Sequence, residues 1–524
     1  MQLLDLSSIE AILEKRLQDG EKKLSDIPHP SLLHDGEKTA KRLARAIKNK
    51  EKITLIGDYD VDGVISTAIV IDFFRQIDAQ ITAIIPNRFR DGYGVNATVL
   101  ERVDADVILT VDNGITASEA ANICLQRGID LLITDHHTPQ KELPKAYSIV
   151  DPKLSTCKYP FKEICGAEVI WLVLALVKKE LGIEVNMRSF VDLLAIAIIA
   201  DIMPLVDINR TLVKDGLKAL ITSSRPASII IRDFLNKKQI SSEDIAFMIA
   251  PRLNAAGRLE DASLALSFIT ATSTQEAYKA FEKLCALNDY RKEIEAEVTK
   301  EAMEMMNEDD AVIVVAKEGW HEGVVGIVAS RLVEHFSKPA IVLSINDATA
   351  KGSARSLGEV DIFELISKNK AYLTKFGGHK MAAGLSLEEK NIALFKEAIN
   401  KDAKQIPKEF FIAKENILGM LDSKAIGFKL LELLEKYEPY GEGNERPKFL
   451  AKEVPIESIR TFGVDNAHCR IRVRFHLHDT STHELVLFRQ VLTEQKQLTC
   501  SFSVNKNEFN NNIYLQLLVN KIYN

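Results

Sequence analysis

The sequence GDYDVDG at residues 57–63 decides the fold of this 524-residue chain. It follows the apolar run ITLI (53–56), typical of a buried parallel strand, and precedes VISTAIV (64–70), typical of a helix. Alternate side chains of an extended backbone share a face, so the three carboxylates of this turn can meet, and a divalent cation relieves their repulsion. A solvated acidic turn that caps the helix is the alternative for this stretch alone. The carboxylates are Asp58, Asp60 and Asp62.

Short apolar runs alternate with helical patterns across the whole segment from 51 to 150. This alternation predicts an α/β fold with a doubly wound parallel sheet, in which the ligand site lies at the carboxyl ends of the strands. The expected strands are 52–56, 81–85, 106–111, 130–134 and 147–150.

Polar or metal-ligating side chains follow every one of these predicted strands. Because parallel strands bring their carboxyl ends to one edge, the sequence predicts a metal site there. A ligand set of carboxylates and imidazole suits manganese or magnesium better than a structural zinc. The number of carboxylates indicates two metal ions that share one aspartate. Such two-metal sites catalyse the hydrolysis of phosphodiesters. The residues at the strand ends are the three turn aspartates, Asn87-Arg88, Asp112-Asn113, Asp135-His136-His137 and Asp151.

The sequence leaves the roles of three residues open: His136, His137 and Asp201. Adjacent histidines on an extended backbone cannot easily bind one ion, so we expect His136 to be a ligand and His137 to orient a ligand or face the substrate. Asp201 ends the apolar helical pattern at 192–203, just before Pro204. Spacing alone allows Asp201 to be either a further ligand or a residue of the terminal turn.

Composition narrows the possible classes of protein. The length predicts two to four domains, and the net charge of −7 excludes a global basic field, so a nucleic-acid partner would need local basic patches. The six cysteines form no C-x-x-C pair, which favours a reducing cytoplasm and argues against structural zinc or disulfides. The longest uncharged apolar run, 193–200, is too short to span a bilayer.

Four motifs resemble those of the DHH phosphoesterase superfamily: DYDVDG (58–63), VDNG (111–114), TDHH (134–137) and AIIADIMPL (197–205). Later motifs resemble RecJ, a family of bacterial single-strand-specific exonucleases, and extend the match from about residue 30 to 450. These are PNRFRDGYG (86–94), GAEV (166–169), PRLNAAGR (251–258), GWHEGVVGIVASRL (319–332), GSARS (352–356), FGGHKMAAG (376–384) and PYGEGNERP (439–447).

The resemblance implies a metal site and a catalytic set. Asp112 would bridge the ions, and Asp135 would orient an imidazole. Many members have a histidine where this chain has Ile56, which gives Asp58 a larger share of the first ion. The implied ligands are Asp58, Asp60, Asp62, Asp112, His136 and Asp201, and the implied catalytic residues are Asp112, Asp135, His136 and His137.

Two glycine-containing segments are candidates for phosphate contact. PRLNAAGRLED (251–261) reads as a turn that carries arginines, with a helix cap as the alternative. Gly377-Gly378 lets backbone amides approach a phosphate, although paired glycines are also common in ordinary turns. The resemblance implies that Arg88, Arg258, Ser353 and Arg355 hold a terminal 5′-phosphate and that Gly377, Gly378 and His379 cradle the backbone.

The resemblance also implies the domain order. We expect an N-terminal helical segment (1–50), a DHH catalytic domain (51–210), a helical region with a long connecting helix at 273–308 (211–310), a smaller DHH-associated α/β domain (311–404) and a C-terminal β-rich OB-like domain (405–524). In the last, HCRIRVRFH (468–476) alternates arginines with apolar residues, which fits a DNA-facing strand or an ordinary half-buried one. NKNEFNNNIY (505–514) predicts a hairpin turn.

The expected activity is single-stranded-DNA-specific 5′-to-3′ exonuclease action that releases 5′-mononucleotides in DNA repair and recombination, with two manganese or magnesium ions. The expected protein is a cytoplasmic monomer without membrane contact, and single-strand-binding protein and a repair helicase are open as partners. A DHH phosphodiesterase for short oligonucleotides or cyclic dinucleotides is the alternative, which residues 405–524 argue against. A degenerate, non-enzymatic DHH scaffold is disfavoured because every carboxylate is present.

Overall fold

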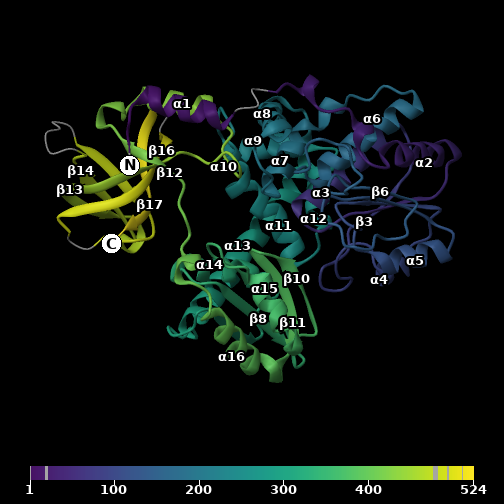
Figure 1. Cartoon of the computed structure of the whole chain (residues 1–524). Coiled ribbons are helices and arrows are strands. Elements are labelled where there is room, and N and C mark those ends of the chain that lie inside the picture. Colours follow the sequence, from purple (N-terminus) through teal and green to yellow (C-terminus); the bar gives the residue numbers. More distant parts are fainter. Residues whose placement is uncertain (1, 18–21, 476–481, 493–494, 510–511, 524) are drawn as a thin grey trace. The chain divides into compact units, whose positions relative to one another are not determined.

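The structure is a computed structural model that describes residues 2–17, 22–475, 482–492, 495–509 and 512–523 (Figure 1). The chain forms two compact units. Unit 1 comprises residues 1–84, 100–248 and 416–524, and unit 2 comprises residues 85–99 and 249–415. Among the described residues, no helix combines the length and hydropathy that a membrane crossing requires.

A five-stranded parallel sheet forms the centre of the catalytic part of unit 1, with strand order β3-β2-β4-β5-β6. Every residue of β2 and β4 is buried, as expected for strands covered on both faces. The five predicted strands are confirmed, with ends that differ by at most one residue. They are β2 (Ile53–Ile56), β3 (Thr82–Ile84), β4 (Val107–Val111), β5 (Asp130–Thr134) and β6 (Ser148–Val150).

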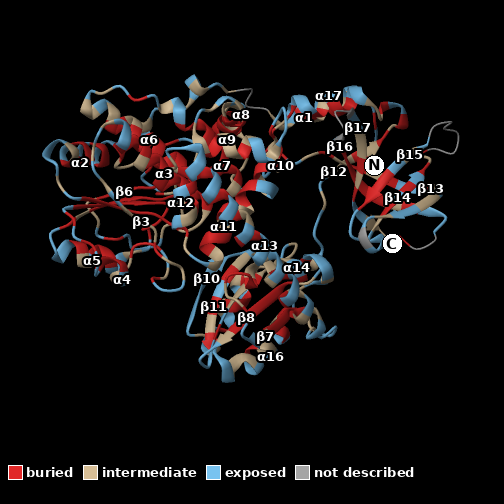
Figure 2. Ribbon diagram, turned by 180° about the vertical axis from the view of Figure 1, so that it is seen from behind, coloured by how far each residue is buried: buried red, intermediate tan, exposed pale blue. Residues whose placement is uncertain are grey.

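Helices cover both faces of this sheet, which confirms the doubly wound arrangement (Figure 1). α2 (Gly36–Asn49), α3 (Val61–Gln76) and α6 (Gly166–Leu181) lie on one face, and α5 (Ser118–Gln126) lies on the other. α7 (Val191–Ala200) packs against both α3 and α8 (Asp207–Thr222). Nine of the ten residues of α7 are buried, because its apolar residues surround the helix, and Asp201 follows as its C-cap (Figure 2).

The C-terminal part of unit 1 is a β-barrel of strand order β1-β12-β13-β14-β15-β17-β16, closed by pairing of β13 with β16. This confirms the β-rich, OB-like prediction. α1 (Leu6–Arg16) buries Ile9 and Leu13 in the barrel core, which α17 (Phe428–Lys436) also covers. The strands are β1 (Leu3–Leu4), β12 (Ile417–Leu421), β13 (Lys448–Phe462), β14 (His468–Val473), β15 (His483–Leu487), β16 (Gln497–Phe509) and β17 (Asn512–Tyr523).

Two local predictions for the barrel are borne out where the structure describes them. In β14, Arg470 and Arg472 are exposed, and they alternate with the buried residues Cys469, Ile471 and Val473. β16 and β17 form the predicted antiparallel hairpin, and the tip at 510–511 lies outside the described residues.

Unit 2 contains a five-stranded mixed sheet of order β10-β11-β9-β8-β7, with one apolar cluster on each face. β7 and β8 are parallel and joined by α14 (Val325–Phe336), which confirms the predicted strand-helix-strand order. The other pairs are antiparallel. The strands are β7 (Ile313–Glu318), β8 (Ala340–Asn346), β9 (Thr349–Arg355), β10 (Lys375–His379) and β11 (Ala382–Glu388).

The long predicted helix is confirmed as α13 (Thr274–Glu304), a 31-residue helix capped by Ser273, whose side chain accepts a hydrogen bond from the Glu276 amide. The predicted turn at 251–261 is wrong, because α11 (Ala250–Leu259) continues through Gly257. Pro251 lies in the first turn, where a missing N–H costs little, and Gly257 is buried within the helix.

Candidate metal centre and phosphate site

The turn after β2 presents its carboxylates through a close backbone approach. Asp60 caps α3, and its side chain accepts a hydrogen bond from the Gly63 amide at 3.0 Å. Asp58 is buried beside this turn. A Cβ at Gly63 would lie 2.6 Å from the Cβ of Asp58, so only glycine fits at the end of the motif.

Asp62 is fixed by the N-terminus of α6. Its carboxylate accepts hydrogen bonds from the Gly166 amide at 2.6 Å and the Ala167 amide at 3.0 Å. A Cβ at Gly166 would lie 2.6 Å from the Cβ of Asp112. The motif GAEV (166–169) does not reveal this role from sequence alone, and the available signal is a glycine that opens an apolar helix.

Asp112 and Asp135 follow β4 and β5 at the same edge of the sheet. Asp112 adopts a left-handed backbone conformation (φ 61°) that turns the chain away from the strand. Asp135 accepts hydrogen bonds from the Ile115 amide at 2.8 Å, the His136 amide at 2.7 Å and the His137 ring Nδ1 at 2.7 Å. Asp135 therefore fixes the backbone that carries both histidines and the orientation of the His137 ring.

The six residues predicted as metal ligands converge, and side chains that could hold a metal ion form three overlapping groups: Asp58/Asp60/Asp112, Asp62/His136/Asp201 and Asp112/His136/His137. His136 Nε2 lies 3.1 Å from an Asp112 oxygen, 3.7 Å from an Asp62 oxygen and 3.6 Å from an Asp201 oxygen. Ligand atoms of Asp58, Asp60 and Asp112 lie within 4.8 Å of one another. Asp112 belongs to two of these groups and lies beside the third, which is the position that a bridging ligand requires.

The electrostatics of these groups favour a bound cation. Burial, followed by the neighbouring carboxylates, raises the pKa of Asp112, raises that of Asp62 to about 6 and raises that of Asp201 to about 9. Burial lowers the pKa of His136 to about 3, so its imidazole is neutral and can act as a ligand. Asp112 Oδ1 and Asp201 Oδ2 are buried and have no hydrogen-bond partner within the described part of the chain. Acceptor-only oxygens around a neutral imidazole fit divalent cations.

His137 differs from His136 in both exposure and charge. Burial acts to lower its pKa, but the bond to Asp135 outweighs burial and raises the pKa to about 9. Its side chain is 44% exposed, so a cationic imidazole faces solvent at the rim of the cluster.

In unit 2, four of the residues predicted to bind phosphate lie on one face of the sheet, and Gly378 of β10 lies in the alternate register. Ser353 pairs with a β11 residue that also pairs with Gly377, and Arg355 is related to His379 in the same way. Directly paired residues share a face, so these two rows lie side by side. Arg355 donates hydrogen bonds to Ser353 Oγ at 2.7 Å and to the Ala354 carbonyl at 2.9 Å. Gly377 and His379 are exposed in the edge strand β10.

The two remaining arginines lie near the turn before α14. Arg258 donates to the Gly323 carbonyl at 3.5 Å, and Arg88 is close enough to His321 to help lower its pKa, after burial. A Cβ at Gly326, in the first turn of α14, would lie 3.2 Å from Ser353 Oγ. The four predicted side chains therefore surround the N-terminus of α14, which favours anions.

His321 is a candidate functional residue that sequence reasoning missed. Its Nδ1 accepts a hydrogen bond from the Gly323 amide at 3.0 Å, which leaves the proton on Nε2, and its ring meets Phe89 edge-on at 5.4 Å. The signal was the histidine in GWHEGVVG, beside the glycines that let the turn approach Arg258.

Comparison with known proteins agrees with this architecture. Residues 52–198 match the DHH family N-terminal domain, residues 309–405 match the DHHA1 domain, and residues 419–521 match the RecJ OB domain.

Curated relatives and a solved structure extend the likeness over almost the whole chain. The chain is 33% identical to the single-stranded-DNA-specific exonuclease RecJ of Bacillus subtilis, covering 95% of this chain and 64% of that protein. It is 32% identical to RecJ of Haemophilus influenzae, covering 96% of this chain and 93% of that protein. The crystal structure of RecJ in complex with Mn2+ from Thermus thermophilus has a TM-score of 0.85 and 28% identity, covering 100% of this chain and 79% of that chain. The chain therefore belongs to the RecJ family of single-stranded-DNA-specific exonucleases.

Proposed function

We propose that this exonuclease degrades single-stranded DNA from the 5′ end and releases 5′-mononucleotides by two-metal hydrolysis. One observation carries the proposal: Asp112 lies beside two groups of metal-ligating side chains at the carboxyl edge of the parallel sheet. The group of Asp58, Asp60 and Asp112 suits one ion, and the group of Asp62, His136 and Asp201 suits the second, with Asp112 3.1 Å from His136.

The donor set supports manganese or magnesium as the ions, because it is rich in carboxylate oxygen and contains no thiolate. RecJ from Thermus thermophilus, which has the similar fold, was crystallised with Mn2+. When bound, such ions activate a water molecule and stabilise the leaving oxygen. The chain's own part is to hold the ligands: the α6 amides fix Asp62, and Asp135 fixes both histidines.

His137 is proposed to contact the substrate. Its Nδ1 bonds to Asp135, and its Nε2 is proposed to donate a hydrogen bond to the phosphodiester. A cationic imidazole beside a phosphate would lower the repulsion between the strand and the carboxylates.

The cationic residues of unit 2 are proposed to hold the 5′-phosphate. Arg88, Arg258 and Arg355 supply charged donors, Ser353 supplies a hydroxyl, and the N-terminus of α14 adds its amides. We add His321 through its Nε2–H. Gly377, Gly378 and His379 are proposed to contact the strand from the exposed edge strand β10.

The barrel is proposed to bind the strand beyond the reacting end. Phe462, His468 and Phe488 form an edge-to-face cluster with ring centroids 5.2–6.1 Å apart, and Arg470 lies over the Phe462 ring at 5.1 Å. Phe488 is 46% exposed. Exposed rings beside arginine are the features on which bases of a single strand stack.

The remaining expectations stay proposals: the domain boundaries given above, a cytoplasmic monomer, roles in repair and recombination, and contacts with single-strand-binding protein and a repair helicase. The six cysteines are free thiols, which supports a reducing compartment.

The test uses one internally labelled oligonucleotide with a phosphate, a hydroxyl or a blocked 5′ end, incubated with manganese. The proposal expects mononucleotides from both free ends and none from the blocked end. Release from the blocked end would overturn the polarity. Rapid hydrolysis of dinucleotides or cyclic dinucleotides, while the long strand stays intact, would favour the small-substrate phosphodiesterase instead.

A further inference from the structure

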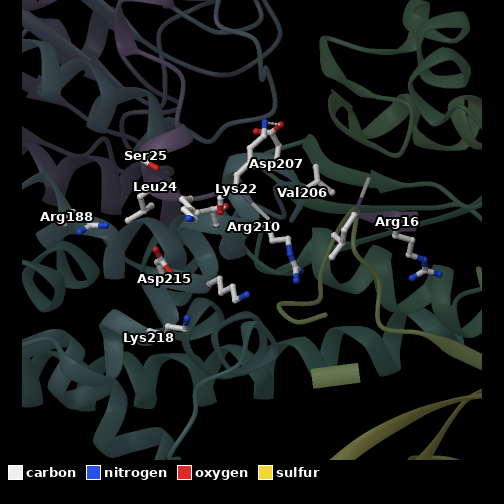
Figure 3. A pocket seen from close by; sticks show the side chains of 14 residues that line it. Arg16, Lys22, Leu24, Ser25, Arg188, Val206, Asp207, Arg210, Asp215 and Lys218 are labelled. Atoms are coloured by element: carbon white, nitrogen blue, oxygen red, sulfur yellow. Dashed lines mark hydrogen bonds and ion pairs between the residues drawn. The ribbon is translucent and has the colours of Figure 1, made fainter. Parts of the chain in front are cut away.

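A basic pocket lies in unit 1, and none of the proposed metal ligands lines it (Figure 3). Its volume is about 450 Å³. One face of α8 forms one wall, and the end of α1, the segment 22–25 and Arg188 form the remainder. The cations that line it are Arg16, Lys22, Lys23, Arg188, Arg210, Lys214 and Lys218.

The pocket carries a large local excess of positive charge. Seven cations and two carboxylates, Asp207 and Asp215, line it, which leaves an excess of five positive charges in a chain of net charge −7. Asp19 and Glu21, which lie outside the described residues, can offset at most two of these charges. This is the kind of local basic patch that composition allows in an acidic chain.

Hydrogen bonds fix part of the pocket wall. Arg210 is buried and donates to the carbonyls of Tyr437 at 2.9 Å and Glu438 at 2.8 Å. Thr211 Oγ1 donates to the Lys22 carbonyl at 2.8 Å, and Lys22 pairs with Asp207. The wall is therefore held in place by contacts that do not need a ligand.

Two other cations of the pocket have exposed side chains. Arg188 and Lys218 have no ion-pair partner among the residues that the structure describes. Residues 207, 210, 211, 214, 215 and 218 follow helical spacing along α8, so they present their side chains on one face. The pocket thus combines a fixed base with exposed, unneutralised cations.

The lining also restricts the ligand. Among the residues that the structure describes, it contains no aromatic ring for a base to stack on, and only Leu17, Leu24 and Val206 are apolar, which offers little to a peptide side chain. Clustered arginine and lysine suit phosphate oxygens.

We propose that this pocket is a phosphate-binding site separate from the metal centre. The phosphates belong either to the backbone of a nucleic-acid strand or to a free phosphorylated compound, and the site is independent of the proposed exonuclease chemistry.

The test measures the binding of inorganic pyrophosphate by calorimetry in the presence of EDTA. It uses the full chain with Arg258→Ala and Arg355→Ala as the background, because these substitutions remove the phosphate site of unit 2. Adding Arg188→Glu and Lys218→Glu is expected to weaken pyrophosphate binding at least about tenfold. The matched control adds Lys41→Glu and Lys145→Glu, which are exposed, lie outside the pocket and change the net charge equally. The control is expected to stay within about twofold.

A second arm separates the two sources of phosphate. Binding of a 5′-blocked 20-nucleotide oligothymidylate in EDTA is followed against salt by fluorescence anisotropy. If a nucleic-acid strand occupies the pocket, the Arg188→Glu and Lys218→Glu variant should show a shallower dependence of log affinity on log salt concentration. The magnitude of the slope should fall by about 0.7 for each phosphate that the variant no longer neutralises. An unchanged slope together with weakened pyrophosphate binding assigns the pocket to a free phosphorylated compound.

Three outcomes would overturn the proposal: equal weakening in pocket and control variants, unchanged pyrophosphate binding, or polyglutamate binding that depends on the pocket while pyrophosphate binding does not. The last would assign the pocket to an acidic peptide. If charge reversal disturbs folding, Arg188→Ala with Lys218→Ala replaces it, with an expected weakening of about threefold.

Discussion

The carboxylate cluster of unit 1 and the cationic residues of unit 2 are both polar sites, but they are built in opposite ways. The cluster gathers buried residues from the ends of neighbouring strands in one sheet, and Asp112 is only 1% exposed. The cationic site takes side chains from four separate segments around the start of α14, and its edge strand β10 is exposed along its whole length.

The difference lies in what each site needs to be stable. Buried like charges repel one another, which is why the pKa values of Asp112 and Asp201 are raised, so the cluster destabilises the fold until a cation binds. The arginines of unit 2 bond to a hydroxyl and to carbonyls of their own chain, so that site is stable without its ligand. The predictions below test this contrast.

The largest effect is expected for Asp112→Asn. Asparagine tolerates the left-handed conformation of this position, so the backbone should be retained. Loss of the shared ligand should lower kcat by about a thousandfold or more. In EDTA, removal of a buried like charge should raise Tm by about 2–4 °C, measured by calorimetry. Arg355→Ala is the comparison and should not raise Tm; a rise of equal size there would remove the contrast between the sites.

Gly166→Ala should have the next largest effect. Its new Cβ would meet the Cβ of Asp112 at 2.6 Å, so the shared carboxylate must move. Misplacement by about 1 Å should cost about a hundredfold in kcat and weaken manganese binding measured by calorimetry. Gly427→Ala is the control, because nothing lies within 4 Å of its added Cβ. Unchanged manganese affinity in Gly166→Ala would show that the helix start does not position the metal ligands.

Arg355→Ala should weaken recognition of the 5′ end of the substrate without changing metal binding. Loss of a charged donor should lower kcat/KM on a 5′-phosphorylated strand by about 10–100-fold and reduce any preference over a 5′-hydroxyl end. Manganese affinity should not change. Lys401→Ala, an exposed lysine of unit 2, is the control. The prediction fails if Arg355→Ala lowers kcat/KM equally for the 5′-phosphorylated strand and for the 5′-hydroxyl strand.

Metal binding should depend on pH in a way that phosphate binding does not. Without metal, Asp201 has a pKa of about 9 and carries a proton at neutral pH, which a bound cation must displace. Manganese affinity should therefore rise about tenfold per pH unit from pH 6.5 to 8.5. Calorimetry in two buffers of different ionisation enthalpy should report release of about one proton. A flat profile would contradict a protonated ligand set.

The parallel sheet of unit 1 was predictable because its strands are short, apolar and closely spaced. Polar or metal-ligating side chains follow the strands, and parallel strands place these side chains at the same edge of the sheet. GDYDVDG, VDNG and TDHH each lie at one strand end, so alternation alone placed Asp58, Asp112 and Asp135 together. The existence of α7 and α13 also followed from local pattern, whereas their predicted C-terminal ends at 203 and 308 lie beyond the observed ends at Ala200 and Glu304.

Features that depend on distant contacts were not predictable. α11 was read as a turn because Gly257 interrupts its pattern, whereas packing decides the helix. The amides of Gly166 and Ala167 matter only because α6 points at Asp62, more than 100 residues earlier in the chain. The basic pocket likewise joins α8 to residues almost 200 positions away, where each lysine alone reads as a solvated surface residue.

The pairing of β1 with β12 has a consequence for the order in which the chain folds. Leu3 and Leu4 form an edge of a barrel whose other strands begin at residue 417, and Ile9 and Leu13 complete its core. On the ribosome, residues 3–13 are synthesised long before residues 417–523, and they must therefore wait for them before they are covered. Until then they leave apolar side chains exposed while the parallel sheet is already complete, a period in which aggregation competes with barrel closure.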